Sequence, residues 1–147
     1  MSGPAPKARK SRNKGADWER EFSALLDAAG IYHMRQHVPR GQTGQIVGAA
    51  APDYLVVVDG VAVFIDCKET ETDALRRDAV RASQRKAFSA IEKAGGLGLV
   101  AIRFIGEPTV RAILRWNRTD TWSNDNAQPD IVAELRRLVA MHKEGGR

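Results

Sequence analysis

The chain has 147 residues and very little cysteine, since Cys67 is the only one. A single cysteine excludes an intrachain disulfide and a zinc site built from several cysteines, which fits a reducing compartment. Long apolar runs are also missing: none approaches the roughly 20 residues that a membrane-spanning helix needs, and no apolar segment follows the basic N-terminus as in a signal peptide. We therefore expect a soluble protein of the cytoplasm, or of the host cytoplasm if a virus encodes it.

Acidic residues are absent from residues 1–14, which form a basic segment. Its cations are Lys7, Arg9, Lys10, Arg12 and Lys14. With these five of the 23 basic residues set aside, the other 18 balance the 18 acidic residues, so the net charge of +5 comes from this segment. Its proline, glycine and serine predict a flexible arm that binds a polyanion or only aids solubility, and charge alone does not choose between the two.

The remaining residues, 15–147, have the composition and length of one globular α/β domain. Trp18, Phe22, Leu25 and Leu26 follow a helical spacing and predict a helix over 16–29, which ends at Gly30. Helices are also expected over 79–94 and 129–142, and strands over 31–38, 53–58, 61–68, 97–105 and 109–116. Residues 39–51 are expected to form a protruding loop or short stalk, and residues 69–78 an irregular segment. This order predicts a mixed sheet with helices on its faces.

A β-hairpin is predicted where Asp59-Gly60 joins two β-branched runs. With a two-residue turn, Asp53 lies directly opposite Asp66, and their Cβ atoms are about 4.5–5.5 Å apart. Because side chains alternate along a strand, Lys68 lies on the same face as Asp66, while Val61, Val63, Ile65 and Cys67 point to the other, apolar face.

Two opposed acids destabilise a sheet unless a positive charge lies between them. Carboxylate oxygens at this spacing suit Mg²⁺, which binds one or two carboxylates together with phosphate oxygens. The alternative is a strand end with solvated charges, and Asp66-x-Lys68 alone would not exclude it. The paired register of Asp53 and Asp66 favours the metal site.

Two further positions are candidates for the same site. On the first helix, Glu19 and Glu21 lie about equally far from the apolar stripe, on opposite sides, so helical geometry does not choose between them. For either one, a boundary salt bridge is an equal alternative. Gln84 lies on the apolar face of its helix with Phe88 and Ile91. A buried amide needs partners, so Gln84 is a core hydrogen-bonding residue or positions a phosphate or water, and we favour the second role.

Histidine and tryptophan give weaker signals. His33 and His37 on one strand are roughly 13 Å apart, too far to share a metal ion. Together with Arg35 they are better interpreted as phosphate contacts or solvated groups. Trp116 and Trp122 could stack on bases or fill a subunit interface, although a core or lid role is more common.

Pro52-Asp53, a gap of twelve residues and Asp66-Cys67-Lys68 together resemble the signature of the PD-(D/E)xK nuclease superfamily. Residues 15–22 are similar to the opening Gly-x-x-x-Glu helix of Holliday junction resolvases of the archaeal Hjc and bacterial RecU types. Gln84, Gly95-Gly96 and the strand over 97–104 resemble the RecU type more closely. The resemblance covers about residues 14–105. Residues 39–51 are shorter than the RecU stalk, and residue 66 is Asp where these resolvases usually have Glu.

The resemblance implies a restriction-endonuclease-like mixed sheet and a structure-specific DNA endonuclease that resolves four-way junctions by paired symmetric nicks. It implies Mg²⁺ as the cofactor, with Mn²⁺ as a possible substitute. By this resemblance Glu19 joins Asp53, Asp66 and the Cys67 carbonyl as a metal ligand. Lys68 would orient the attacking water and offset charge on phosphorus. Gln84 would help to place that water or a phosphate oxygen.

The expected partner is branched DNA. Two symmetric cuts need two active sites, so one site per chain implies a homodimer. The expected phosphate contacts are the five cations of the basic segment together with Arg20, Arg35 and Arg40. Two alternatives remain open. One is another nuclease of this superfamily that acts on linear duplex or flap DNA, and the other is a non-catalytic DNA-binding module on the same scaffold.

Overall fold

A computed structural model describes the backbone of residues 6–36, 52–118 and 121–145, and within these ranges the side chains from residue 16 onward, apart from Arg77. The helices are α1 (Pro6–Ala28), α2 (Ala82–Lys93) and α3 (Ile131–Gly145), with short 3-10 helices η1 (Arg77–Ala79) and η2 (Asn124–Asn126). The strands are β1 (Tyr32–Arg35), β2 (Tyr54–Val58), β3 (Val61–Thr70), β4 (Ala74–Leu75), β5 (Leu97–Phe104), β6 (Val110–Arg115) and β7 (Trp122–Ser123).

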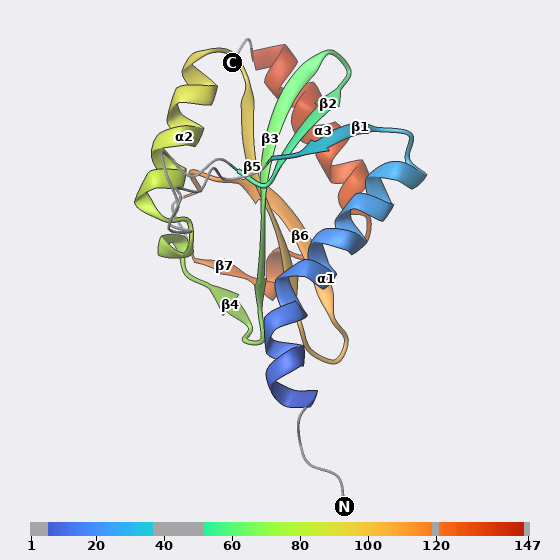
Figure 1. The fold of residues 1–147 in the computed structure, drawn as a ribbon. Helices are drawn as coiled ribbons and strands as arrows, with labels where there is room; N and C mark the ends of the chain where they lie inside the picture. The colour runs from blue at the N-terminus through green and yellow to red at the C-terminus, as the bar shows by residue number, and fades with distance from the viewer. Residues whose placement is uncertain (1–5, 37–51, 119–120, 146–147) are drawn as a thin grey trace, which may run out of the picture.

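Five strands form a central mixed sheet in the order β1-β2-β3-β5-β6. Neighbouring strands are antiparallel except β3 and β5, which are parallel and are connected through α2. Helix α2 lies on one face of the sheet, while α1 and α3 lie on the other (Figure 1). The predicted α/β class, a mixed sheet flanked by helices, is confirmed.

The tight hairpin between β2 and β3 has the predicted register, from Val58 opposite Val61 to Tyr54 opposite Ile65. Asp59 and Gly60 both have positive φ, of 50° and 82°. This is the backbone that a two-residue turn needs in order to match the twist of the strands, and Asp-Gly adopts it readily. The turn therefore fixes which residues of β2 and β3 lie opposite each other.

Helix α1 packs its predicted apolar stripe against the sheet, with Trp18, Phe22 and Leu26 buried beside Val63 and Ile65. The helix begins at Pro6 rather than at residue 16, so most of the segment expected to be a separate flexible arm has helical backbone. The alanine, lysine and arginine of this segment have high helix propensity, which the charge argument did not weigh.

On the opposite face, α2 buries Phe88 against β5 in a second core that includes Trp122. The close approach requires a glycine, because a Cβ at Gly98 would lie 2.6 Å from the Phe88 ring and 2.7 Å from the Trp116 ring. Trp116 stacks on Phe88 with ring centroids 5.5 Å apart. Both tryptophans therefore have core roles in this chain.

The expectation of an irregular segment over 69–78 is wrong in part. Strand β3 continues to Thr70, and Ala74-Leu75 forms β4, which pairs with β7. A pairing of two residues with a strand almost 50 residues later leaves no periodic signal in the sequence. The loop expected over 39–51, with Arg40, and His37 lie outside the described residues. In the part that the structure describes, no helix is long and apolar enough to cross a membrane.

Candidate active site

Asp53 and Asp66 come together at the open end of the β2–β3 hairpin, one position beyond the last residue pair, Tyr54 and Ile65. Asp53 Oδ2 accepts a hydrogen bond of 2.8 Å from the backbone N–H of Cys67. Asp66 is almost fully buried, with 1% of its surface exposed. The structure therefore places the two aspartates next to each other across the hairpin, as the sequence predicts.

This meeting has an electrostatic cost. The pKa of Asp53 is raised from 3.8 to about 7, first by burial and then by the charge of Asp66, while the Cys67 N–H opposes the shift and Glu19 adds to it. A buried carboxyl next to a second carboxylate resists ionisation, because burial removes the hydration of its charge and the neighbouring negative charge repels it. A bound cation would relieve this cost.

Lys68 and Gln84 form a closed triangle with Asp66. Lys68 Nζ lies 2.9 Å from Asp66 Oδ2, and Gln84 Nε2 donates to the same oxygen at 3.0 Å. Lys68 Nζ also donates to Gln84 Oε1 at 3.2 Å. The first turn of α2 thus fixes both the acid and the lysine of β3, and the buried amide of Gln84 contacts the site residues themselves.

Glu19 reaches the site from α1 on the other face of the sheet. Its carboxylate forms an ion pair with Arg35 of β1, and its backbone carbonyl accepts a hydrogen bond of 3.0 Å from the Tyr54 hydroxyl. Arg35 and Tyr54 are cross-strand partners in β1 and β2. One residue pair of the sheet therefore holds both the main chain and the side chain of Glu19.

Glu21 has a different environment, which separates it from Glu19. Its carboxylate accepts a 2.8 Å hydrogen bond from Arg103 Nη1 and pairs with Arg111. Arg103 also pairs with Glu69, and its guanidinium carbon lies 5.7 Å from the centre of the Trp18 ring. Glu21 therefore belongs to an ion-pair network that attaches α1 to β5 and β6, whereas Glu19 lies near Asp53.

The residues present fit a divalent cation. Within the described ranges no three His, Cys, Asp or Glu side chains gather closely enough to enclose a metal ion. However, Asp66 Oδ1 is buried and has no hydrogen-bond partner among the residues that the structure describes, and Asp53 beside it is the group that a cation would stabilise. The assignment of a metal to Glu19, Asp53, Asp66 and the Cys67 carbonyl stays a prediction.

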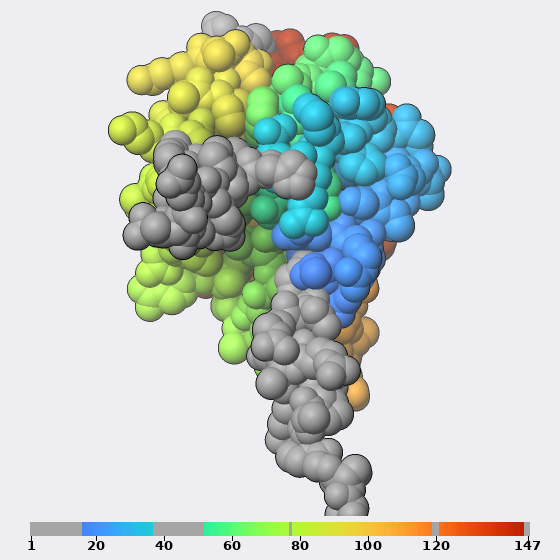
Figure 2. Space-filling view, in the orientation of Figure 1, coloured from blue at the N-terminus to red at the C-terminus, as the bar shows by residue number. Residues whose placement is uncertain are grey.

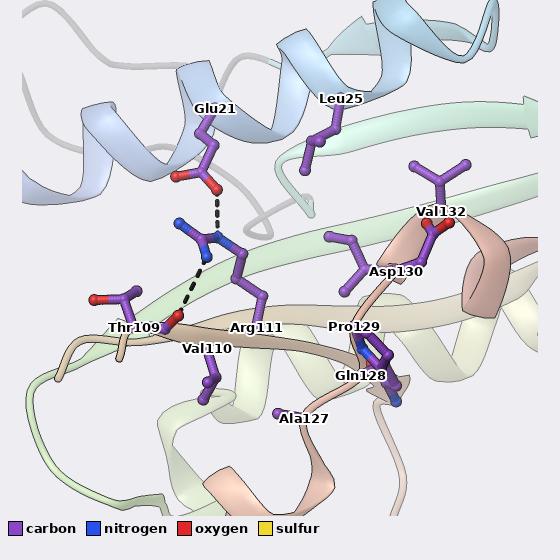
Figure 3. A pocket seen from close by; sticks show the side chains of 11 residues that line it. Glu21, Leu25, Thr109, Val110, Arg111, Ala127, Gln128, Pro129, Asp130 and Val132 are labelled. Carbon is purple, nitrogen blue, oxygen red and sulfur yellow. Dashed lines mark hydrogen bonds and ion pairs between the residues drawn. The ribbon is translucent and has the colours of Figure 1, made fainter. Parts of the chain in front are cut away.

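A cavity of about 420 Å³ lies elsewhere, between α1, β6 and the start of α3 (Figure 3). The Glu21–Arg111 pair forms one wall, and the opposite wall includes Pro129 and Val132. None of its lining residues belongs to the set Glu19, Asp53, Asp66, Lys68 and Gln84. The candidate active site is therefore the end of the hairpin and not this cavity.

The predicted DNA contacts are placed only in part. Arg20 is exposed and pairs with Asp17, and Arg35 is about half exposed beside Glu19. Lys7, Arg9, Lys10, Arg12 and Lys14 fall on the helical backbone of α1, with side chains outside the description. His33 packs edge-on against Tyr54 at 6.0 Å between ring centroids. The assignment of these residues to DNA stays a prediction.

Sequence reasoning missed Tyr54. Alternation along β2 places it on the face opposite Asp53, towards α1, where it is buried. A buried tyrosine hydroxyl needs a partner, and here Ser23 Oγ lies 2.8 Å from it in addition to the Glu19 carbonyl. The sequence did carry a signal for this role, because Tyr54 directly follows the candidate metal ligand Asp53.

A mixed sheet with two opposed acids and a lysine at the end of its central hairpin, flanked by a glutamate from the first helix, defines the class of PD-(D/E)xK nucleases. The comparisons with known proteins specify the family. The family model "Archaeal holliday junction resolvase (hjc)" matches residues 10–144, and the chain belongs to this family. By family it is a junction-resolving endonuclease.

The solved structures agree with the fold. The 1.6 Å structure of Archaeoglobus fulgidus Hjc, a Holliday junction resolvase from an archaeal hyperthermophile, matches with a TM-score of 0.57. The match covers 84% of this chain and 96% of that chain, at 16% sequence identity, so it bears on the fold alone. A search of curated protein sequences found no match. Of the two resolvase types that the sequence resembles, the family match is to Hjc, although Gln84 and the following strand resemble RecU.

Proposed function

We propose that this chain hydrolyses DNA phosphodiesters at four-way junctions with Mg²⁺ as its cofactor and Mn²⁺ as a substitute. The observation that carries the proposal is the pair of Asp53 and Asp66 beside Lys68. One buried carboxylate oxygen of this pair has no hydrogen-bond partner among the described residues, and the pKa of the Asp53 carboxyl is raised to about 7. Such a pair is costly for the fold unless a cation occupies the site.

The residues have separate roles in this proposal. Asp53, Asp66, the Cys67 carbonyl and Glu19 hold the metal ion, which when bound polarises the scissile phosphate and stabilises the leaving oxygen. Lys68 orients the attacking water and offsets the negative charge that develops on phosphorus.

Gln84 positions Lys68 and Asp66, because its amide accepts a hydrogen bond from Lys68 and donates one to Asp66. A rigid amide between the two charged groups keeps the ammonium at a fixed distance from the acid throughout the reaction. The proposed products are paired nicks of like polarity with 5′-phosphate and 3′-hydroxyl ends.

We further propose that the active form is a homodimer, because two symmetric cuts need two sites. An apolar surface supports this. Tyr32 and Val57 are cross-strand partners, as are Met34 and Leu55, on the sheet face that also carries Asp66. Tyr32, Met34 and Val57 are exposed, and strand β1 lies at the molecular surface (Figure 2). A contiguous exposed apolar patch is typical of a protein interface.

Binding to DNA would come from phosphate contacts by Arg20, Arg35, Arg40 and the basic residues 7–14. This binding would not depend on sequence and would weaken steeply with salt. The place of action would be the cytoplasm, where the DNA substrate is accessible.

The test compares a synthetic four-way junction with a linear duplex of the same sequence, each with and without Mg²⁺. We expect cleavage of the junction only, with Mg²⁺ only, and with symmetric nicks in opposite arms. Equal cleavage of the two substrates would favour a nuclease for linear or flap DNA. Binding of the junction without any cleavage in Mg²⁺ or Mn²⁺ would favour a non-catalytic binding module.

A further inference from the structure

We propose that Arg35 is an internal counterion of the active site. When the metal ion binds, the guanidinium of Arg35 moves from the Glu19 carboxylate to a DNA phosphate. Arg35 would thus couple metal binding to DNA binding, as a positioning residue that acts through Glu19. The inference rests on the proposed function, because it assumes that Glu19, Asp53 and Asp66 serve a metal ion.

The first support is the geometry around Glu19. Its carboxylate is mostly buried, with 16% of the side chain exposed, while the side chain of Arg35 is 54% exposed. The main chain of Glu19 is fixed by the Tyr54 hydroxyl, which donates to its carbonyl at 3.0 Å. The carboxylate therefore stays close to the site, while the guanidinium can turn towards solvent or a ligand.

The second support is the balance of charge. Lys68 pairs with Asp66 and Arg35 pairs with Glu19, whereas in the described part of the chain no cation forms an ion pair with Asp53. A divalent ion is therefore attracted to Asp53 and Asp66 but is repelled by Arg35 while the guanidinium stays on Glu19.

A phosphate is a suitable second partner for Arg35. The guanidinium binds phosphate with two parallel hydrogen bonds, as it binds a carboxylate. When a phosphate near the scissile bond takes Arg35, Glu19 becomes free for the metal ion. The coupling is reciprocal. If bound junction raises the affinity for the metal ion by some factor, then bound metal raises the affinity for the junction by the same factor.

The first experiment titrates Mg²⁺ into the full chain without DNA, by calorimetry. Arg35→Met removes the competing cation, and we expect about a threefold to tenfold tighter Mg²⁺ affinity than in the wild type. Arg35→Lys keeps the charge and should stay near the wild-type value. Unchanged or weaker Mg²⁺ binding by Arg35→Met would overturn the proposal, because it would make Arg35 irrelevant to the metal or a support for the Glu19 ligand.

The matched control is Arg137→Met. Arg137 pairs with Glu134 on α3, with side-chain exposures of 58% and 16%, nearly the same as those of Arg35 and Glu19. We expect its Mg²⁺ affinity to equal that of the wild type. Unfolding of each variant in denaturant is measured alongside, so that a general loss of folded protein is recognised.

The second experiment measures the affinity for a four-way junction with Ca²⁺ and with EDTA. Wild type should bind the junction several-fold more tightly with Ca²⁺, and Arg35→Met should lose most of this difference, whatever its overall affinity. If the ratio of the junction affinity in Ca²⁺ to that in EDTA were the same in wild type and Arg35→Met, the proposed coupling would be contradicted. If the wild type itself bound no divalent ion, the proposed function would fail together with this inference, whereas an equal ratio leaves the proposed function intact.

Discussion

At the scale of single residues, Asp53 bears the energetic cost of the site. We predict that Asp53→Asn stabilises the metal-free protein by about 1–3 kcal/mol at pH 8, because the variant removes a buried charge next to Asp66. The amide oxygen can still accept the Cys67 N–H.

Denaturant unfolding in EDTA and in Mg²⁺ measures this effect. The wild type should gain stability from Mg²⁺, and Asp53→Asn should gain much less. Asp78→Asn, at an exposed position paired with Arg76, is the control, and it should change neither the stability in EDTA nor the gain in stability from Mg²⁺. A destabilised Asp53→Asn would contradict the electrostatic account.

The raised pKa of Asp53 also predicts how stability depends on pH. Between pH 3.8 and about 7 the folded metal-free protein holds a proton on Asp53 that the unfolded chain has released. The contribution of this group to stability is therefore fully present at low pH and is lost as pH rises towards about 7. Unfolding in EDTA across this range should show the loss in the wild type and not in Asp53→Asn. Identical pH profiles of the two proteins would contradict the prediction.

At the scale of elements, α1 carries two glutamates with different partners, and we propose opposite roles for them. We predict that Glu21→Gln lowers the free energy of unfolding by about 1–3 kcal/mol, because Arg103 and Arg111 lose a charged partner in a partly buried network. Its cleavage rate per folded molecule should stay within a few-fold of the wild type.

Glu19→Gln should behave in the reverse way, with cleavage reduced about a hundredfold or more and a smaller loss of stability, because removal of its charge weakens the pair with Arg35 but also relieves repulsion with Asp53. Urea unfolding and single-turnover cleavage of a junction measure both properties on the same preparations. If Glu21→Gln lost cleavage and Glu19→Gln kept it, the assignment of the two residues would be wrong.

The elements differ in how far the sequence predicts them. The β2–β3 hairpin was predictable because Asp59-Gly60 determines both the turn and the register, and with them the meeting of Asp53 and Asp66. The β4–β7 pair was not, because two residues held by a distant partner have no pattern of their own. The choice between Glu19 and Glu21 depends on cations from β1, β5 and β6, which are far away in the sequence.

At the scale of the whole molecule, the apolar surface on β1 and β2 predicts self-association. Met34→Lys places a charge in this surface and should shift a dimer towards monomer in sedimentation velocity at micromolar concentration. Met141→Lys is the matched control, because Met141 is similarly exposed but lies on α3. A monomeric wild type, or a Met34→Lys variant as dimeric as the wild type, would contradict a dimer through this surface.

The central claim is that Asp53, Asp66 and Lys68 form the catalytic metal site of a junction-resolving nuclease. Its most direct test is Asp66→Asn assayed on one four-way junction in Mg²⁺, with gel-shift binding and cleavage measured on the same sample. We predict that binding is kept or improved while cleavage falls by about a hundredfold or more. Cleavage at the wild-type rate by Asp66→Asn would contradict the claim.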